Sequence, residues 1–569
     1  MVMKQGASKS RKMSDLFRFG TILLIIVGIN LIGNFKFARL DLTAEKRFTL
    51  SDSTKNMLRN IDDVVYVQCY LDGDLNADFK KMRNATKEIL DEFKAYAGIN
   101  LQYDFINPFE VKEEKNKQKA AYDLMQRGLS PFVVNENSAE GTSVNMIFPG
   151  ALVSFKGKTV PVNFMKSQAK RAPEAVFKEA IENLESTFAQ AIYVLQNINQ
   201  RKMVAIASGH GELTERQNLY FRDQLKDLYF VKQVKISSDL TSIPKETRVL
   251  IIAKPDSVFD EGSKFVIDQF VMRGGRVLWM LDNIYFPTDS VSNNVRIGVP
   301  LDLNLDDILF KYGVRINYDL LNDAQCGKIM LPRQSGGQNG IEYRPWVFFP
   351  SMQVNPDFVI TKNIGNVKME YAGSIDTIGI KNVKKTPLLY TSNMSRAPKA
   401  PVRLTPQIAF MEPSPAVFNK KGLMGAVLLE GTFTSVFENR LAQKENMPAE
   451  FAPVFKSKET KMIVVSDGDL SVNYFDPQSL ENFPPGSYPQ TGEYYGGNLK
   501  FLMNCVNYLM DDAWLVPLRS KEFKIRVFNT KKLKKEQNYW TWMNTLVPIG
   551  SVLFIGLIFY FVRKYKYAK

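Results

Sequence analysis

The hydrophobic pattern divides the chain into two long apolar stretches near its ends and a long middle of mixed character. Residues 16–33 are apolar apart from Arg18 and Asn30, and residues 541–562 contain no charged side chain. An apolar helix of about 20 residues crosses a hydrocarbon core of about 30 Å. The pattern therefore predicts a transmembrane helix at each end.

The residues that border these stretches support that interpretation. Trp540 and Trp542 stand where the second stretch begins, as interfacial aromatic residues do, and Arg563 follows it directly. The first stretch follows basic residues, as in a signal peptide or a signal anchor. Cleavage after Ala38 would need a small residue at the position that Lys36 occupies, so we expect an uncleaved anchor.

Between the anchors, residues 39–199 show short alternating runs and amphipathic helical patterns. The predicted elements are strands at 61–71, 99–106 and 131–135, helices at 78–96, 115–127 and 174–196, and a hairpin over 146–162. This βαβαββ order, closed by a helix, predicts an N-terminal α/β domain with a thioredoxin-like layout but without its redox motif.

From residue 200 to residue 515 the pattern changes to continuous apolar runs separated by helices, at 203–208, 248–253, 276–282 and 461–467. Such runs are typical of parallel strands covered on both faces, so we predict a doubly wound α/β domain. A Gly- and Pro-rich, strand-like stretch near 322–420 predicts a β-rich insertion or an edge subdomain. A basic stalk at 516–540 leads to the second anchor.

Most of the net charge of +15 lies beside the two apolar stretches. Residues 1–18 contribute +4, residues 531–536 contribute +3 and residues 563–569 contribute +4, which together make +11 of the +15. This placement indicates lipid headgroups rather than nucleic acid as the partner. We expect a two-pass protein of the inner membrane, with the basic N-terminus (1–15) and tail (563–569) in the cytoplasm and the large domain in the periplasm.

Several motifs of enzymes are missing from the sequence. It has no GxxxxGK[ST] phosphate loop, no GxSxG nucleophile elbow and a single histidine, too few for an ordinary zinc hydrolase. Its three cysteines have no CxxC spacing, which favours free buried thiols. We therefore expect a non-catalytic protein without a cofactor.

The candidate functional site is the segment Ser208, Gly209, His210, Gly211 and Glu212. It follows a predicted buried strand, where open α/β sheets bind ligands, and its glycines would let a ligand approach the backbone. Two other interpretations stay open. Thr214 and Gln217 form a capping box, so the segment could simply start a helix; a histidine with a carboxylate could also do acid–base work.

Asp467 and Asp469 follow another predicted buried strand and complete the candidate ligand- or partner-binding set. Two carboxylates there could hold Mg²⁺ or Ca²⁺, but an aspartate at such a position commonly caps the next helix. We predict no metal site.

Four segments together resemble the GldG family: the run RLDLTAEKRFTLS at 39–51, Ser208–Glu212, Gly274-Gly275 before a buried strand, and VVSDGD at 464–469. Members of that family are auxiliary, so-called substrate-binding components of an ABC transporter linked to gliding motility in Bacteroidetes. The resemblance covers nearly the whole chain. It implies that the middle domain is similar to flavodoxin or to class I amidotransferases, without their catalytic groups.

The resemblance also implies partners: an ABC permease subunit, a cytoplasmic ATP-binding subunit and, at the periplasmic side, gliding or secretion components. The soluble domain would bind a ligand or a periplasmic partner. Two rival interpretations stay open. The soluble domain could be a structural interaction platform for gliding or secretion machinery without transport, or an extracytoplasmic hydrolase that uses His210 and Glu212.

Overall fold

A computed structural model describes residues 16–28, 50–110, 114–138, 141–165, 173–198, 200–287, 295–335, 338–440, 452–476, 481–516 and 536–567. The chain divides into two compact units, residues 1–521 and residues 522–569, which are considered separately. The predicted cytoplasmic N-terminus (1–15), residues 39–49 and residues 517–535 of the predicted stalk lie outside the described residues.

The first part of the larger unit is built on a four-stranded sheet in the order β2-β1-β5-β6. β1 (Val65–Cys69) and β2 (Leu101–Phe105) are parallel and are joined by α3 (Ala77–Ala97), whereas β5 (Gly150–Phe155) and β6 (Lys158–Asn163) form an antiparallel hairpin. The remaining elements are α2 (Asp52–Arg59), α4 (Glu114–Gln126) and a hairpin of β3 (Phe132–Ser138) and β4 (Gly141–Ile147). The predicted βαβ unit and closing hairpin are present; the name thioredoxin-like stays a prediction.

The helix predicted over 174–196 is in fact two helices, α5 (Pro173–Glu182) and α6 (Leu184–Gln196), which meet at Asn183. α6 is buried along most of its length and packs on β5 and β6. The backbone of Ser51 and the hydroxyl of Thr54 both donate to Glu185 of α6 at 2.8 Å. These bonds satisfy a buried carboxylate, which would otherwise destabilise the fold.

The second part centres on a ten-stranded sheet, whose parallel half has the order β23-β10-β9-β7-β8. The predicted continuous apolar runs are all strands of this half: β7 (Met203–Ser208), β9 (Thr247–Ala253), β10 (Arg276–Met280) and β23 (Thr460–Val465). β8 (Phe230–Lys235) forms its edge.

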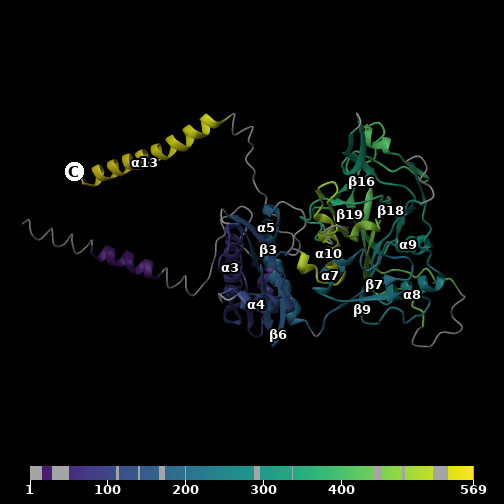
Figure 1. Cartoon of the computed structure of the whole chain (residues 1–569), viewed down its shortest axis with the longest axis horizontal. Coiled ribbons are helices and arrows are strands. Elements are labelled where there is room, and N and C mark those ends of the chain that lie inside the picture. Colours follow the sequence, from purple (N-terminus) through teal and green to yellow (C-terminus); the bar gives the residue numbers. More distant parts are fainter. Residues whose placement is uncertain are drawn as a thin grey trace, which may run out of the picture. The chain divides into compact units, whose positions relative to one another are not determined.

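Helices cover both faces of the parallel strands, which explains why these strands are apolar throughout. Val204 and Ile206 of β7 join one apolar cluster, and Ala205 and Ala207 join another on the opposite face. The covering helices are α7 (Leu219–Lys226) and α10 (Gly497–Leu509) in the first cluster, and α8 (Glu261–Met272) and α9 (Asp306–Tyr312) in the second (Figure 1). The architecture is mixed α/β; its likeness to flavodoxin or amidotransferases stays a prediction.

The stretch near 322–420 contributes strands to the antiparallel edge of the same sheet. β22 (Met424–Gly431), β19 (Val383–Tyr390), β16 (Gln338–Val354) and β15 (Cys326–Ser335) follow β23 in that order. Short strands complete this part: β11 (Ile284–Tyr285), β12 (Arg296–Pro300), β13 (Val314–Ile316), β14 (Asn322–Asp323), β17 (Val367–Lys368), β18 (Ile375–Thr377), β20 (Ser395–Arg396), β21 (Val402–Leu404), β24 (Tyr474–Asp476), β25 (Glu481–Phe483), β26 (Ser487–Tyr488) and β27 (Glu493–Tyr494).

The smaller unit contains α13 (Gln537–Tyr567), the second predicted transmembrane helix. Its stretch Tyr539–Tyr565 has 27 residues and a mean hydropathy of 2.3, which is long and apolar enough to cross a membrane. The first predicted span, 16–33, is described only as the helix Leu16–Gly28. At 1.5 Å per residue that helix measures about 20 Å, less than a hydrocarbon core. Two-pass topology therefore stays a prediction.

Candidate functional site

The predicted site residues all lie at one edge of the central sheet, where parallel strands end side by side. Residues 208–212 end and follow β7, and Asp467 and Asp469 follow β23. Between these strands lie β9 and β10, which are followed by Lys254 and Asp282. Open α/β sheets commonly bind ligands at this edge.

The side chains of His210 and Glu212 are packed into the protein, with 7% and 9% of their residue surface exposed. The imidazole stacks on Phe259 with ring centroids 3.9 Å apart, and the backbone N–H of His210 donates to Glu212 at 2.7 Å. The Nδ1 atom of His210 lies 3.8 Å from Oε1 of Glu212, beyond hydrogen-bond distance. This geometry is that of a packed loop rather than an acid–base pair.

Two glycines allow the loop to fold over its own side chains. Gly209 and Gly211 have φ values of +118° and +76°, which side chains rarely tolerate. A Cβ atom at Gly211 would lie 1.6 Å from Oδ1 of Asp256, and the N–H of Asp256 donates to the carbonyl of His210. The exposed part of the loop is therefore glycine backbone.

The capping box predicted from Thr214 and Gln217 is only half formed. The Thr214 N–H donates to the Gln217 side chain at 2.9 Å, and the Thr214 hydroxyl donates to the same atom. The helix does not begin there, because residues 215–218 form a turn and α7 starts at Leu219. A helix does follow the segment, as that open interpretation required, but it begins at residue 219 rather than at 215, four residues later than a cap at Thr214 would place it.

The second part of the edge is a cluster of carboxylates with a lysine. Asp282, Asp467 and Asp469 bring oxygens within 4.8 Å of one another. The Lys254 ammonium lies 3.4 Å from Asp282 and forms a closer ion pair with Asp469. Carboxylates at this spacing could hold a divalent cation, but Lys254 already supplies positive charge there, so an ion would have to compete with it.

The environment of this cluster changes its acid–base behaviour. Burial, with the charge of Asp469, raises the pKa of Asp282 to about 6. Burial and the charges of Asp469 and Asp282 raise the pKa of Asp467 well above its ordinary value. Burial lowers the pKa of Lys254, but the neighbouring carboxylates outweigh it and raise the pKa overall. Because three carboxylates share one ammonium group, the cluster reduces its charge by holding protons.

Asp467 also joins the parallel strands to the antiparallel edge of the sheet. Its Oδ2 atom accepts the N–H of Glu370 at 2.8 Å, and its Oδ1 atom accepts the N–H of Asp469 at 2.7 Å. Beside Glu370, the buried Lys368 ammonium pairs with the Glu370 carboxylate at 3.1 Å and lies 3.2 Å from the ring centre of Tyr488. Asp467 thus holds structural elements together.

Sequence reasoning missed Lys254 and Asp282, although a signal was present. Each is the first charged residue after a continuous apolar run, at the same strand ends as the residues that were predicted. That Lys254 and Asp282 lie beside the predicted site residues is clear only from the strand order, which places β9 and β10 between β7 and β23.

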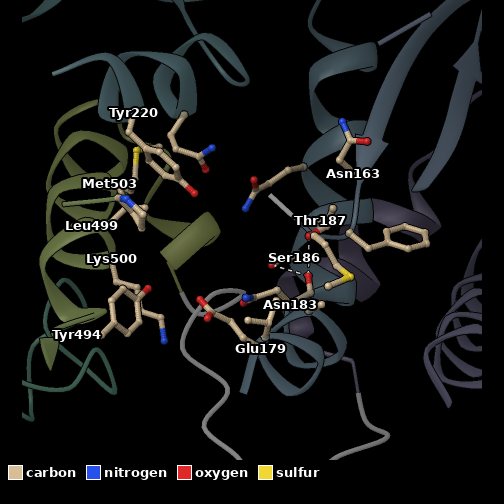
Figure 2. Close-up of a pocket in the computed structure, with 17 residues that line it drawn as sticks. Asn163, Glu179, Asn183, Ser186, Thr187, Tyr220, Tyr494, Leu499, Lys500 and Met503 are labelled. Carbon is tan, nitrogen blue, oxygen red and sulfur yellow. Dashed lines mark hydrogen bonds between the residues drawn. The ribbon is translucent and has the colours of Figure 1, made fainter. Parts of the chain in front are cut away.

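A cavity with a mixed polar and apolar lining lies elsewhere in the larger unit, between α5 and α6 on one side and α7 and α10 on the other. Figure 2 shows Asn183 and Thr187 on one wall and Tyr220 and Lys500 on the other. This cavity measures about 160 Å³, and a neighbouring one of about 560 Å³ extends it along α6 and α7. We call the two cavities the helix-lined groove; they share Asn163, Met165, Thr187, Gln190, Tyr220 and Gln224.

Comparison with known proteins identifies relatives of this chain. An uncharacterized protein of Borreliella burgdorferi is 23% identical over 541 residues, which cover 93% of this chain and 94% of that protein. The solved mmIFT52 N-terminal domain matches 54% of this chain and 97% of its own length at 11% identity, and its TM-score of 0.31 is too low to carry an argument.

Two families match the chain directly. Residues 44–154 match a domain of unknown function, DUF7088. Residues 201–505 match the auxiliary family described as an ABC-type uncharacterized transport system, and this segment contains the whole strand-end site. Because the second match covers more than half of the 569 residues, the protein belongs to this family of ABC transport-system auxiliary proteins.

Proposed function

We propose that the protein is a non-catalytic, extracytoplasmic subunit of an ABC transporter, anchored in the inner membrane. The observation that carries this proposal is the family match over residues 201–505, followed in the chain by the apolar span Tyr539–Tyr565. The span supplies membrane attachment, and the family supplies the transport system. Binding of a ligand or a periplasmic partner would then be the task of the α/β domains.

The proposal assigns ATP hydrolysis and substrate passage to other chains. The sequence has no GxxxxGK[ST] motif, so a separate ATP-binding subunit would hydrolyse the nucleotide. Two apolar helices at most cannot build the multi-helix pathway of a permease, so a permease subunit would provide it. The basic residues before 16–33 and after 541–562 support cytoplasmic termini and a periplasmic domain.

The packing of the strand-end loops bears on whether the α/β domains bind a ligand at the strand ends. His210, Glu212 and Asp467 are buried. Oε2 of Glu212 and both oxygens of Asp467 accept backbone N–H groups, whereas Nδ1 of His210 and Oε1 of Glu212 have no hydrogen-bond partner among the described residues. This arrangement favours a structural role for the strand ends over a ligand site or a hydrolase. It gives some weight to the alternative that the domain is an interaction platform without transport. The links to gliding motility and to Bacteroidetes rest on the resemblance to the GldG family alone.

The test is affinity isolation of the tagged full-length chain from its native membrane in mild detergent, followed by identification of the proteins that accompany it. We expect a permease and an ATP-binding subunit with a phosphate loop. Untagged membranes serve as the control. Recovery of envelope or secretion proteins without either transporter subunit would contradict the proposal and support the platform.

A further inference from the structure

We propose that the helix-lined groove is a binding site for a neutral, hydroxyl-rich ligand of the saccharide type. This inference rests on the proposed role of the α/β domains in ligand binding, but it concerns different residues from the strand-end site. The larger cavity of about 560 Å³ lies within the usual size range of ligand pockets.

The first observation is a polar stripe on α6 that faces another helix. Asn183, Thr187 and Gln190 are spaced by four and three residues, so they lie on one side of the helix. On α7, Tyr220 and Gln224 are four residues apart and line the same groove. Helices that pack directly bury apolar stripes against each other. Here polar stripes line an open space instead.

The second observation is the hydrogen-bonding capacity of this lining. The hydroxyls of Ser186 and Thr187 both donate to the carbonyl of Asn183 at 2.8 Å (Figure 2). Each of these two hydroxyl oxygens keeps lone pairs with which it can also accept a hydrogen bond from a ligand. Sugar hydroxyls can donate to such acceptors.

The third observation is the charge balance of the groove. Its two cavities are lined by three acidic and three basic residues, namely Glu179, Asp223, Asp227, Arg201, Lys226 and Lys500. The lining therefore has no net charge. A site for phosphates or other anions would need an excess of positive charge, and a site for cations the opposite. The balance favours a neutral ligand.

Apolar and aromatic side chains complete the lining. The largely buried Phe164, Met165 and Met503 form apolar parts of the wall, and Tyr220 and Tyr494 contribute rings with a polar tip. A sugar ring has an apolar C–H face as well as hydroxyls, so it can use both kinds of surface. Tyrosine suits such contacts because one end is apolar and the other forms hydrogen bonds.

An extended peptide fits the groove less well. β6 is an edge strand, and its residues 160–163 line the larger cavity. A peptide added as a new strand would need backbone donors along that edge. Pro161 of β6 has no N–H to donate. Prolines occur on edge strands at positions where the N–H would face outward, so this edge is poor for strand addition.

Contacts just beyond the end of the groove hold its two walls together. Tyr193 of α6 donates its hydroxyl to Asp512 at 3.0 Å, and the Lys202 ammonium pairs with the same carboxylate at 2.7 Å. Tyr193 also packs edge-on against Trp514, with ring centroids 5.0 Å apart. The groove is therefore largely formed before a ligand arrives, which lowers the free-energy cost of binding.

The test measures binding of three neutral hexasaccharides, of β-linked glucose, α-linked glucose and N-acetylglucosamine, to the purified full-length chain in detergent by saturation-transfer NMR and calorimetry. We expect at least one to bind at or below about 10 mM. Gln190→Arg should abolish binding by filling the groove, and Tyr220→Ala should weaken it about tenfold. Gln126→Arg and Tyr122→Ala on the exposed surface of α4 are the matched controls and should bind normally.

Absence of binding by all three sugars overturns the groove assignment, as does binding that survives Gln190→Arg in a folded protein. If a neutral decapeptide competes with the sugar for the wild-type protein, and Gln190→Arg abolishes peptide binding, the ligand of the groove is a peptide and not a saccharide. Because this assay uses the isolated chain, its result is independent of affinity isolation of the transporter subunits. Failure of one test therefore leaves the other standing.

Discussion

The strand-end site and the helix-lined groove both contain polar residues, but these residues are arranged in opposite ways. At the strand ends, His210 is stacked on Phe259, and the carboxylate of Asp467 accepts two backbone N–H groups. In the groove, Gln190 and Tyr220 line an open cavity of about 560 Å³. Polar residues at a sheet's ligand-binding edge can thus be structural, while other polar residues line a cavity elsewhere in the same unit.

The comparison predicts that changes at the strand ends mainly alter stability, whereas changes in the groove mainly alter binding. The largest expected effect at the strand ends is that of Lys254→Met, which leaves Asp282 and Asp469 without their counter-ion. Since Lys254 is about one-third exposed (34%), we expect a loss of about 2–3 kcal/mol, below that of a fully buried pair. Urea unfolding would measure it, with Lys232→Met on exposed β8 as the control. An equal effect of both variants would contradict the assigned role.

The pH dependence of stability is the next largest effect. The pKa of Asp282 is raised in the folded protein from 3.8 to about 6, so the folded state holds a proton that the unfolded state releases. This contribution is complete below about pH 4 and is lost as the pH rises through about 6. Relative to Asp282→Asn, the wild-type protein should therefore lose about 2 kcal/mol over that interval. Unfolding curves at several pH values would show it; a constant difference would refute it.

The third effect distinguishes a packing role of the His210 side chain from a catalytic role. His210→Ala should destabilise the protein by about 1–2 kcal/mol because it removes the stack on Phe259. His210→Phe keeps an aromatic ring and should lose less stability. Thermal unfolding and a growth or transport assay would compare them. Equal loss of function in two stably folded variants would instead revive the hydrolase interpretation.

The smallest expected effect on stability belongs to the groove. Gln190→Ala and Gln224→Ala remove groups that line the cavity, so each should change the free energy of unfolding by no more than about 0.5 kcal/mol. Leu195→Ala, on the buried side of α6, is the matched contrast and should cost about 2–4 kcal/mol. Large losses in both glutamine variants would mean that the groove is a packed joint and not an open site.

Periodicity predicted the central strands well because their environment leaves few alternatives. A strand covered on both faces must be apolar at every position, so the runs at 203–208 and 248–253 correspond to β7 and β9 within one residue. The break between α5 and α6 was missed, because Asn183 sits within a continuous helical pattern and only packing against β5 and β6 reveals the second helix.

The site was predicted less well, for a different physical reason. Local sequence shows that His210 and Asp467 follow buried strands, but not whether their side chains point outward or are covered by Phe259 and Glu370. Lys254 meets Asp469 only because the strand order brings β9 close to β23. The groove depends on helices far apart in the chain, so no local pattern could predict it.

Hydrogen–deuterium exchange of the full-length chain, with and without a bound neutral hexasaccharide, tests this contrast most directly. The account predicts slower exchange in α6 and α7, which line the groove, and no change in residues 208–212 or 467–469. Protection confined to those two strand-end loops, or protection in neither place, would contradict it.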